Sequence, residues 1–301
     1  MTLTLSQAPV PLGKSGLSVT PLSWGMWRFA GRSVGEAAKL VHAALDCGIT
    51  FLDTAAIYGF GSPSGFGAAE ALLGDVLRAD PGLRARMTLA TKGGIVPPTP
   101  YDTSAAYVAQ TIDESLARLG VDTIDLFMIH RPDPLGSAAE IAGALDAAVA
   151  AGKVRAVGVS NYTPSQVRAL AAHLKAPLAV NQIEYSPLEI APLADGALDL
   201  AQELGFATMA WSPLGGGRLG EPSGLWQQAV AGALDTVAGK HGVSRAAAAY
   251  AWIMAHPARP IPIVGSQNAA RIAEAADAFK VEWTRADWYA VLIAARGEKL
   301  P

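Results

Sequence analysis

The chain has 301 residues, of which 51% are hydrophobic and 16% are charged, and its formal net charge is −3 at pH 7. This length suits one barrel-sized domain or two ordinary ones, and the composition is sufficient to fill a large core. The slightly acidic balance and the scattered lysines and arginines exclude the electrostatic footprint of a nucleic-acid-binding protein. They favour a small neutral or anionic partner.

Cysteine content and the N-terminal sequence limit the other classes. Cys47 is the only cysteine, so the chain has no internal disulfide and no cysteine-cluster metal site. The spacing of the histidines does not match a metal site either, and no metal is expected. The stretch Met1–Val10 has no basic start before an apolar core, and apolar runs of membrane-spanning length are absent. We therefore expect a cytoplasmic protein that does not contact a membrane.

The N-terminal third begins with a predicted hairpin. Two short apolar pieces within residues 10–19 flank a Gly-Lys-Ser-Gly turn, which predicts a β-hairpin that caps the fold. A short strand is expected at 22–26. Ser33 is the expected N-cap of a helix that ends before Gly48.

Strands and helices then alternate along the chain. Apart from the first, the strands are expected at 50–53, 88–91, 124–130, 154–159, 178–182, 206–211 and 261–264. The helices are expected at 68–79, 104–119, 137–151, 164–174, 195–204, 225–241, 244–256, 268–278 and 285–295. The strands are brief, continuously apolar runs, which is typical of parallel strands covered by helices. The pattern has no midpoint break. It predicts an α/β fold, a single (β/α)8 TIM barrel over residues 1–301 with an N-terminal β-hairpin cap and extra C-terminal helices, in preference to a doubly wound sheet.

Ionisable residues stand at the ends of three consecutive predicted strands. Asp53 ends the second strand and is followed by Tyr58, Lys92 ends the third, and His130 ends the fourth. In a barrel these ends meet at one rim, where catalytic residues lie. A lysine is costly to bury alone, so a Lys92–Asp53 ion pair is expected. The ammonium group is expected to lower the pKa of Tyr58 from about 10, making it a proton donor and acceptor.

The next strands end in neutral polar residues and an indole. Ser160, Asn161 and Gln182 form a donor and acceptor set that suits a carboxamide and does not suit a metal. Trp211, after the seventh strand, can stack on a flat heteroaromatic ring. These residue types favour a cofactor with an amide-bearing ring.

Two later segments are candidate phosphate sites. Gly215–Gly220 matches G-x-G-x-x-G, but Glu221-Pro222 follows where a Rossmann helix would run, so the loop with Arg218 is expected to wrap a pyrophosphate in another fold. The helix start after the eighth strand, with Ser266 and Arg271, suits one more phosphate.

In order and spacing, these residues resemble the aldo-keto reductases over essentially the whole chain. The motifs are Asp53-Thr-Ala with Tyr58-Gly, Thr91-Lys92, His130, Gly158-Val-Ser160-Asn161, Asn181-Gln182, the Trp211-Ser-Pro-Leu-Gly-Gly-Gly loop and Ile261-Pro-Ile-Val-Gly265-Ser266 with Arg271. The runs His-Arg-Pro-Asp-Pro-Leu and Trp-Ser-Pro-Leu-Gly-Gly-Gly-Arg-Leu look like a bacterial branch of general oxidoreductases.

The resemblance implies the reversible, NADPH-dependent reduction of an aldehyde or ketone to an alcohol. Tyr58 would protonate the carbonyl oxygen, Lys92 with Asp53 would tune it, and His130 would orient the carbonyl. NADP is the implied cofactor, with NAD a weaker alternative. Its implied contacts run from the amide and ring, through the pyrophosphate, to the 2′-phosphate and adenine: Ser160, Asn161, Gln182, Trp211, Ser212, Leu214, Gly216, Arg218, Gly265, Ser266, Arg271 and Glu274. Ser266 replaces the lysine of some branches, and Ala275 replaces a polar adenine contact.

Aromatic residues are the candidate substrate pocket. Trp24 and Trp27 lie at and after the first strand, and Phe60 and Phe66 belong to the Gly-rich loop at 59–67, which we expect to control access. The expected partner is a small carbonyl or alcohol substrate, and the expected assembly is a monomer or weak homo-oligomer. Two other functions fit the residues: an NADPH-binding redox-sensing module of this fold, and a Schiff-base aldolase with Lys92 as nucleophile.

Overall fold

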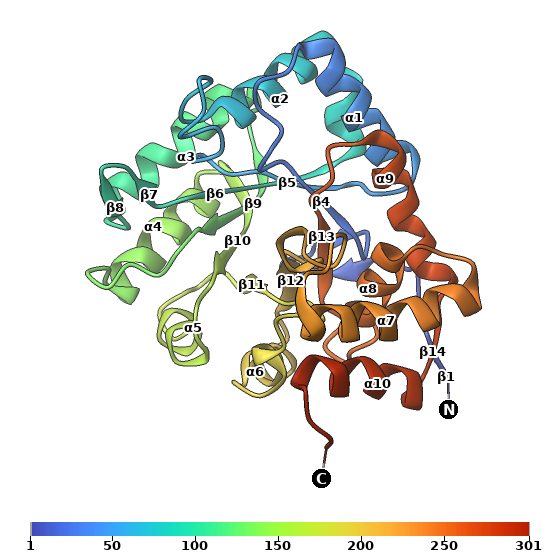
Figure 1. The fold of residues 1–301 in the computed structure, drawn as a ribbon. Coiled ribbons are helices and arrows are strands. Elements are labelled where there is room, and N and C mark those ends of the chain that lie inside the picture. The colour runs from blue at the N-terminus through green and yellow to red at the C-terminus, as the bar shows by residue number, and fades with distance from the viewer. Residues whose placement is uncertain (1, 301) are drawn as a thin grey trace.

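A closed barrel of eight parallel strands forms the centre of the molecule in the computed structural model, which describes residues 2–300 (Figure 1). The strands follow the chain around the ring as β4 (Ser23–Gly25), β5 (Phe51–Asp53), β6 (Thr88–Gly93), β9 (Ile124–Ile129), β10 (Val154–Ser160), β11 (Leu178–Glu184), β12 (Ala207–Trp211) and β13 (Ile261–Val264). β13 pairs with β4 and closes the ring. The predicted (β/α)8 TIM barrel is confirmed.

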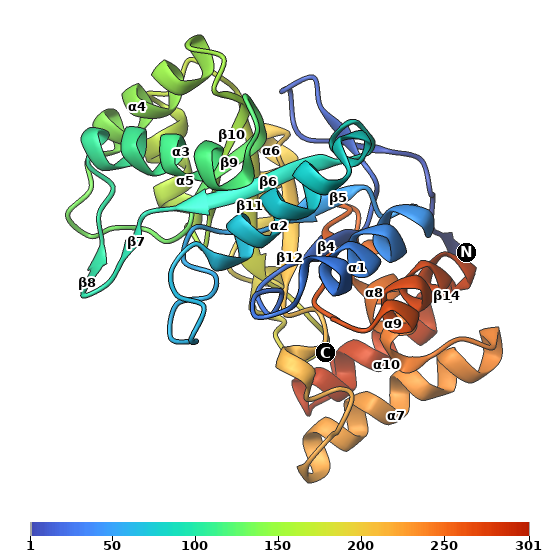
Figure 2. The same cartoon turned by 90° about the horizontal axis from the view of Figure 1, so that it is seen from above.

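Helices surround the barrel (Figure 1). They are α1 (Val34–Asp46), α2 (Ala68–Ala79), α3 (Ala105–Leu119), α4 (Ala138–Ala150), α5 (Pro164–Ala171), α6 (Ala197–Leu204), α7 (Gly224–His241), α8 (Arg245–Met254), α9 (Ala269–Glu274) and α10 (Arg285–Arg296). The extra C-terminal helices α7 and α10 pack side by side (Figures 1 and 2). None of the helices within residues 2–300 is both long enough and apolar enough to cross a membrane.

Local sequence signals explain where several helices begin. Ser33 caps α1, and its hydroxyl accepts from the Glu36 N–H while the Glu36 carboxylate accepts from the Ser33 N–H. Thr163 and Gln166 form the same capping box at α5. Each box satisfies N–H groups that the first turn leaves unpaired, so these starts could be predicted from the sequence.

The predicted N-terminal hairpin closes one end of the barrel. β2 (Val10–Pro11) and β3 (Ser18–Val19) pair antiparallel. The hairpin residues Leu12 and Leu17 are buried in the same cluster as the barrel residues Phe51, Leu126 and Met209. The hairpin therefore covers apolar side chains at the barrel interior that water would otherwise reach.

Three features differ from the expected elements. β1 (Thr2–Thr4) pairs antiparallel with β14 (Glu282–Thr284), a contact between distant segments that a local pattern does not reveal. A second hairpin, which the sequence did not predict, is formed by β7 (Ile95–Val96) and β8 (Thr99–Tyr101) and extends from the end of β6 (Figures 1 and 2). The helix expected at 268–278 divides into α9 and a 3₁₀ segment at Ala275–Lys280.

Candidate active site

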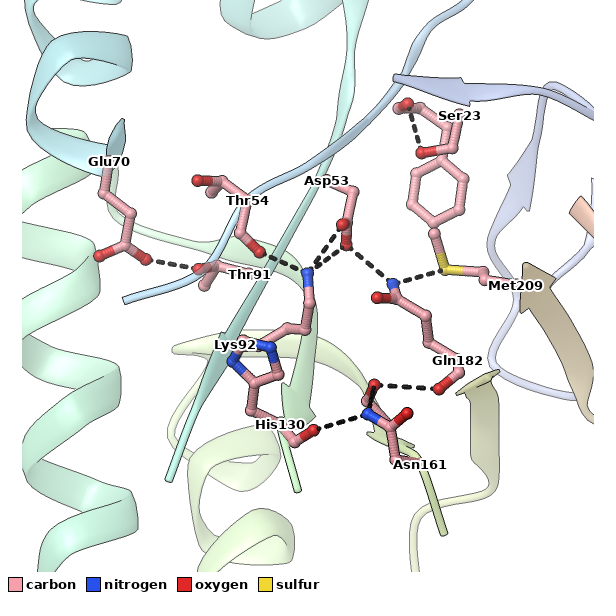
Figure 3. Close-up of polar contacts among 12 residues, drawn as sticks. Ser23, Asp53, Thr54, Glu70, Thr91, Lys92, His130, Asn161, Gln182 and Met209 are labelled. Atoms are coloured by element: carbon pink, nitrogen blue, oxygen red, sulfur yellow. Dashed lines mark hydrogen bonds and ion pairs between the residues drawn. The ribbon is translucent and has the colours of Figure 1, made fainter. Parts of the chain in front are cut away.

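A buried ion pair occupies the rim where β5 and β6 end (Figure 3). The Lys92 ammonium lies 2.8 and 2.7 Å from the two Asp53 carboxylate oxygens and 2.8 Å from the Thr54 carbonyl oxygen. Burial acts to lower the pKa of Lys92. The contacts with Asp53 and Tyr58 raise it by more, so the pKa of Lys92 is raised overall. The predicted pair is therefore present, and its lysine is protonated with all three of its N–H donors used.

Tyr58 lies over this pair at the start of the loop after β5. The Lys92 ammonium is 5.0 Å from the centre of the Tyr58 ring. Burial is the largest influence on the phenol and raises its pKa above 10.0, although the charge of Lys92 acts in the opposite direction. The expectation of a lowered Tyr58 pKa is therefore wrong, because desolvation favours the neutral phenol and Asp53 offsets the nearby ammonium.

His130 faces Tyr58 from the end of β9. The two rings are 5.9 Å apart between centres and meet edge to face at 77°. Burial, together with the charges of Lys92 and Arg131, lowers the pKa of His130 well below 6.5. The imidazole is thus neutral at physiological pH. Its Nδ1 atom is buried and has no hydrogen-bond partner within residues 2–300, so the ring has capacity for a further polar contact.

The neutral residues of the next strands form one hydrogen-bonded group (Figure 3). Asn161 donates from Nδ2 to Ser160 Oγ at 2.8 Å and to the His130 carbonyl at 3.2 Å, and its Oδ1 accepts from Trp211 Nε1 at 2.9 Å. Ser160 Oγ donates to the Gln182 carbonyl oxygen at 2.9 Å. Asn161 holds a left-handed backbone conformation, with φ of 62°, which is unfavourable for most residues. Thr163, and not Ser160, is the N-cap of α5, so the Ser160 hydroxyl is available for the hydrogen bonds of this group.

Gln182 joins this group to the ion pair and tests whether a nicotinamide amide fits. Its Nε2 donates to Asp53 Oδ1 at 3.0 Å. Within residues 2–300 its Oε1 takes part in no hydrogen bond, although the residue is buried. An amide oxygen of a buried residue that accepts no bond from the protein can accept one from the N–H of a carboxamide. The residues present therefore fit the amide of a nicotinamide.

The loop after β12 has the backbone freedom expected for a phosphate site. Gly215, Gly216 and Gly217 all have positive φ values, of 59°, 69° and 98°. A Cβ atom at Gly216 or Gly217 would meet nothing within 4 Å, so this side of the loop is open to a bound group. Arg218 Nε donates to the Gly215 carbonyl at 2.7 Å. Between β12 and α7, which begins at Gly224, the loop contains a 3₁₀ turn at Gly215–Gly217 and no α-helix, so the Rossmann context is absent, as expected.

The segment after β13 begins with exposed Gly265 and leads into α9. Asn268 is the N-cap of α9, and its Oδ1 accepts from two N–H groups of the first turn. Arg271 is exposed, and no salt bridge holds it within residues 2–300. Ser266 and Glu274 are half-buried at the two ends of this segment. The helix predicted from 268 thus has Asn268 as its N-cap, and Ser266 lies two residues before that cap.

The proposed substrate pocket needs one correction. Trp24 is fully buried, donates from Nε1 to the Ser266 carbonyl at 2.9 Å and packs edge to face on Phe29. It belongs to the core, because its position within β4 points it between the barrel and the outer helices. Trp27, Phe60 and Phe66 are 68%, 57% and 37% exposed, so these three remain available to line a pocket.

Sequence reasoning missed Arg131 as a member of the site. Its guanidinium lies 5.6 Å from the centre of the Trp211 ring. Its charge contributes to the lowered pKa of His130 and acts against the raised pKa of Tyr58. Within residues 2–300 no carboxylate lies within salt-bridge distance of it. The signal was its place directly after His130, at the end of a rim strand.

The titratable residues of the described chain can be compared with the ligand sets of metal ions. Between residues 2 and 300, His, Cys, Asp and Glu side chains form no group of three or more that could hold a metal ion. The arrangement instead offers a neutral phenol, a protonated lysine and a neutral imidazole beside a carboxamide site. Such a set can orient a carbonyl group and transfer a proton to it.

Comparisons with known proteins agree with this chemistry. The chain is 61% identical to a 6-dehydroglucose reductase of Novosphingobium aromaticivorans, over 99% of this chain and 100% of that protein. It is 40% identical to a 6-dehydroglucose reductase of Agrobacterium fabrum, over 94% and 97% of the two chains. A crystal structure of the thermostable aldo-keto reductase Tm1743 with the inhibitor epalrestat has the same fold, with a TM-score of 0.81, 24% identity and coverage of 94% and 98%.

The family comparison extends over most of the chain. The model of the Aldo/keto reductase family matches residues 21–294, a range that runs from the start of the first barrel strand into α10. The family generally uses nicotinamide cofactors, which agrees with the fit at Gln182. The chain therefore belongs to the aldo/keto reductase family and is an oxidoreductase that acts on carbonyl groups.

Proposed function

We propose that this protein reduces an aldehyde or ketone with NADPH, and that the reaction runs in both directions. The observation that carries the proposal is the position of Tyr58, with the buried Lys92–Asp53 pair below it and the neutral His130 ring at its edge. When bound, the nicotinamide supplies a hydride to the carbonyl carbon. The residues of the chain orient the carbonyl and supply the proton.

Tyr58 is the proton donor in this proposal. The phenol O–H breaks, its proton goes to the carbonyl oxygen, and the resulting phenolate is stabilised by the Lys92 ammonium until solvent returns a proton. The raised Tyr58 pKa keeps the phenol protonated at neutral pH, which suits a general acid. His130, neutral because its pKa is lowered, donates a hydrogen bond to the same oxygen and fixes its direction.

The cofactor residues follow the path of rim segments from β10 to α9. We propose that Ser160, Asn161 and Gln182 hold the amide, that Trp211 stacks on the ring, and that Ser212, Leu214, Gly216 and Arg218 line the pyrophosphate. Gly265, Ser266 and Arg271 would take the 2′-phosphate, and Glu274 the adenine. The exposed Arg271 guanidinium, which no salt bridge holds within residues 2–300, supports NADP over NAD.

The proposed substrate is an aldehyde of a sugar. Support comes from the 61% identity to a 6-dehydroglucose reductase, whose name describes a glucose oxidised at position 6. The unpaired Arg131 guanidinium beside Trp211 offers hydrogen-bond donors to a polyhydroxylated molecule. We further propose that residues 1–301 act as a single domain and as a monomer or weak homo-oligomer.

The Schiff-base aldolase is the weaker alternative. An attacking lysine must be a free amine, whereas the Lys92 ammonium has a raised pKa and uses all three N–H donors. Trapping with borohydride and a carbonyl compound should leave the protein unmodified. A redox-sensing module would instead bind NADPH tightly and turn over slowly, and a stoichiometric partner recovered in a pull-down would favour it.

The direct test is to follow NADPH absorbance with 6-dehydroglucose and with simple aldehydes, ketones, keto-steroids and other sugars, with NADH in parallel. We expect oxidation of NADPH with the aldehyde sugar at a higher kcat/KM than with the other compounds. If no carbonyl compound in the panel supports NADPH oxidation, the proposed function is wrong.

A further inference from the structure

A second buried carboxylate lies behind the catalytic rim. Glu70, in the first turn of α2, is fully buried, and its Oε2 accepts from Arg118 Nε of α3 at 2.7 Å. The Arg118 side chain is 20% exposed. A carboxylate without access to water needs such a partner, since a buried charge without one is strongly destabilising.

This pair is connected to the strand that carries Lys92. The other Glu70 oxygen accepts from the hydroxyl of Thr91, which is fully buried on β6 (Figure 3). Thr91 immediately precedes Lys92. The chain of contacts Arg118–Glu70–Thr91 therefore joins α3 and α2 to the segment that holds the catalytic ammonium.

The same elements fix the base of the loop that begins at Tyr58. The Ala69 N–H donates to the Tyr58 carbonyl at 3.2 Å, so the start of α2 closes the loop at 59–67 directly onto the backbone of the tyrosine. Glu70 is the next residue after Ala69. A shift of the first turn of α2 is thus expected to move Tyr58.

Arg118 also touches the far end of that loop. Its guanidinium lies 5.8 Å from the centre of the Phe66 ring. Gly67 has a φ of +80°, and a Cβ atom there would lie 2.5 Å from Arg118 Cδ, so the backbone and the arginine are in close contact. A cleft of about 320 Å³ lies beside these residues, and Phe66, Gly67 and Arg118 line it. Arg118 therefore connects the loop end, through its pair with Glu70, to the packed helices.

We propose that Arg118 is a positioning residue that holds the loop at 59–67, and with it Tyr58 and the aromatic residues Phe60 and Phe66, in the arrangement that binds the carbonyl substrate. The inference rests on the proposed function for its kinetic part only. Lysine cannot replace this arginine fully, because the planar guanidinium pairs with Glu70 and lies near the Phe66 ring at the same time.

The test compares Arg118→Met and Arg118→Lys with the parent protein. Methionine keeps most of the length and removes the charge and the donors. We expect Arg118→Met to raise the KM for the carbonyl substrate about tenfold while the KM for NADPH stays within about twofold, since the cofactor path lies on other strands. Arg118→Lys should recover part of the loss. Chymotrypsin should cut after Phe60 and Phe66 several times faster in Arg118→Met, as mapped by mass spectrometry.

The matched control is Arg84→Met. Arg84 is 28% exposed and pairs at 2.9 Å with Asp125, which is itself 4% exposed, and both lie near the N-terminal ends of the strands. This variant should lose thermal stability without any change in substrate KM or in loop cleavage. The proposal is overturned if Arg118→Met and Arg118→Lys match Arg84→Met in both readouts. Chymotrypsin cleavage needs no carbonyl substrate, so it still tests whether Arg118 holds the loop if carbonyl reduction is not observed. Should Arg118→Met not fold, Glu70→Gln takes its place beside Arg118→Lys.

Discussion

Gln182 on β11 donates a hydrogen bond across the barrel to Asp53 on β5, at 3.0 Å between Nε2 and Oδ1. The two strands are not neighbours in the ring, so this bond directly couples the proposed amide site to the ion pair under Tyr58. A change at Gln182 is therefore expected to affect cofactor binding and chemistry together.

The first prediction concerns this bond. Gln182→Met keeps the length of the side chain but removes both the donor to Asp53 and the acceptor for the amide. We expect the KM for NADPH to rise about tenfold and kcat to fall, because each lost hydrogen bond to a charged group is worth about 1.5–3 kcal/mol. Steady-state kinetics with NADPH varied at saturating substrate measures both. A change in neither constant would contradict the coupling.

The second prediction concerns the proton donor. Tyr58→Phe removes one hydroxyl and keeps the ring against Lys92 and His130. Carbonyl reduction should fall by about 10²–10⁴-fold, the usual contribution of a general acid, while NADPH binding, measured by quenching of tryptophan fluorescence, stays unchanged. Activity near the parental rate would exclude Tyr58 as the acid.

The third prediction is the pH dependence of the reaction. Tyr58 donates a proton only below its own pKa, which burial raises above 10.0, and His130 is neutral because its pKa lies well below 6.5. The rate of reduction should therefore stay flat through neutral pH and decline only in strongly alkaline solution. A descending limb with a midpoint near pH 7 in kcat/KM would contradict this assignment.

The third prediction extends to stability, because the lowered pKa of His130 should make the folded protein less stable in acid. His130 resists protonation in the folded protein, whereas in the unfolded chain it takes a proton near its ordinary pKa of 6.5. Below that value the unfolded state binds more protons, so the free energy of unfolding decreases as the pH falls. Urea unfolding at pH 7.5 and 5.5 should show a smaller decrease in His130→Gln than in the parent. Equal decreases would mean that His130 is not responsible.

The fourth prediction separates two nearby tryptophans. Trp24 is fully buried and Trp27 is 68% exposed. Trp24→Phe leaves a cavity and loses the bond to the Ser266 carbonyl, so it should cost about 2–4 kcal/mol of stability. Trp27→Phe should leave the free energy of unfolding within about 0.5 kcal/mol and change the substrate KM. Chemical denaturation together with substrate kinetics distinguishes the two, and the reverse pattern would restore Trp24 to the pocket.

The fifth prediction concerns cofactor choice. Arg271→Ala removes an exposed charge at α9 and should lower the preference for NADPH over NADH about tenfold or more, since a charge-assisted bond to phosphate is lost. The ratio of the two kcat/KM values measures it. Arg285→Ala, at the exposed start of α10, is the control and should leave the ratio unchanged. An unaltered ratio in Arg271→Ala would remove the 2′-phosphate assignment.

Much of the barrel could be predicted because its signals are local. Apolar runs mark the strands, Ser33 and Thr163 mark helix starts, and the strand ends carry Asp53, Lys92 and His130. The pairing of β1 with β14 could not be predicted, since it joins segments from the two ends of the chain.

The side-chain environment was the harder part of the site. The direction of the Tyr58 pKa depends on how far burial and Asp53 offset Lys92, which residue order does not reveal. Trp24 was misplaced for a similar reason: an aromatic residue on a short strand can face the core or the pocket, and only packing decides. Arg131 was overlooked because its contact is with Trp211, eighty positions later in the chain.

The pairing of β1 with β14 also has a mechanical meaning. β1 pairs with the segment that leads into α10, so hydrogen bonds between Thr2–Thr4 and Glu282–Thr284 join the first strand of the chain to its last. A force that pulls the two ends of the chain apart acts on the β1–β14 pair before it acts on the barrel strands. Fraying that starts at the N-terminus must open these hydrogen bonds first, whereas fraying from the C-terminus reaches them only after α10 has opened.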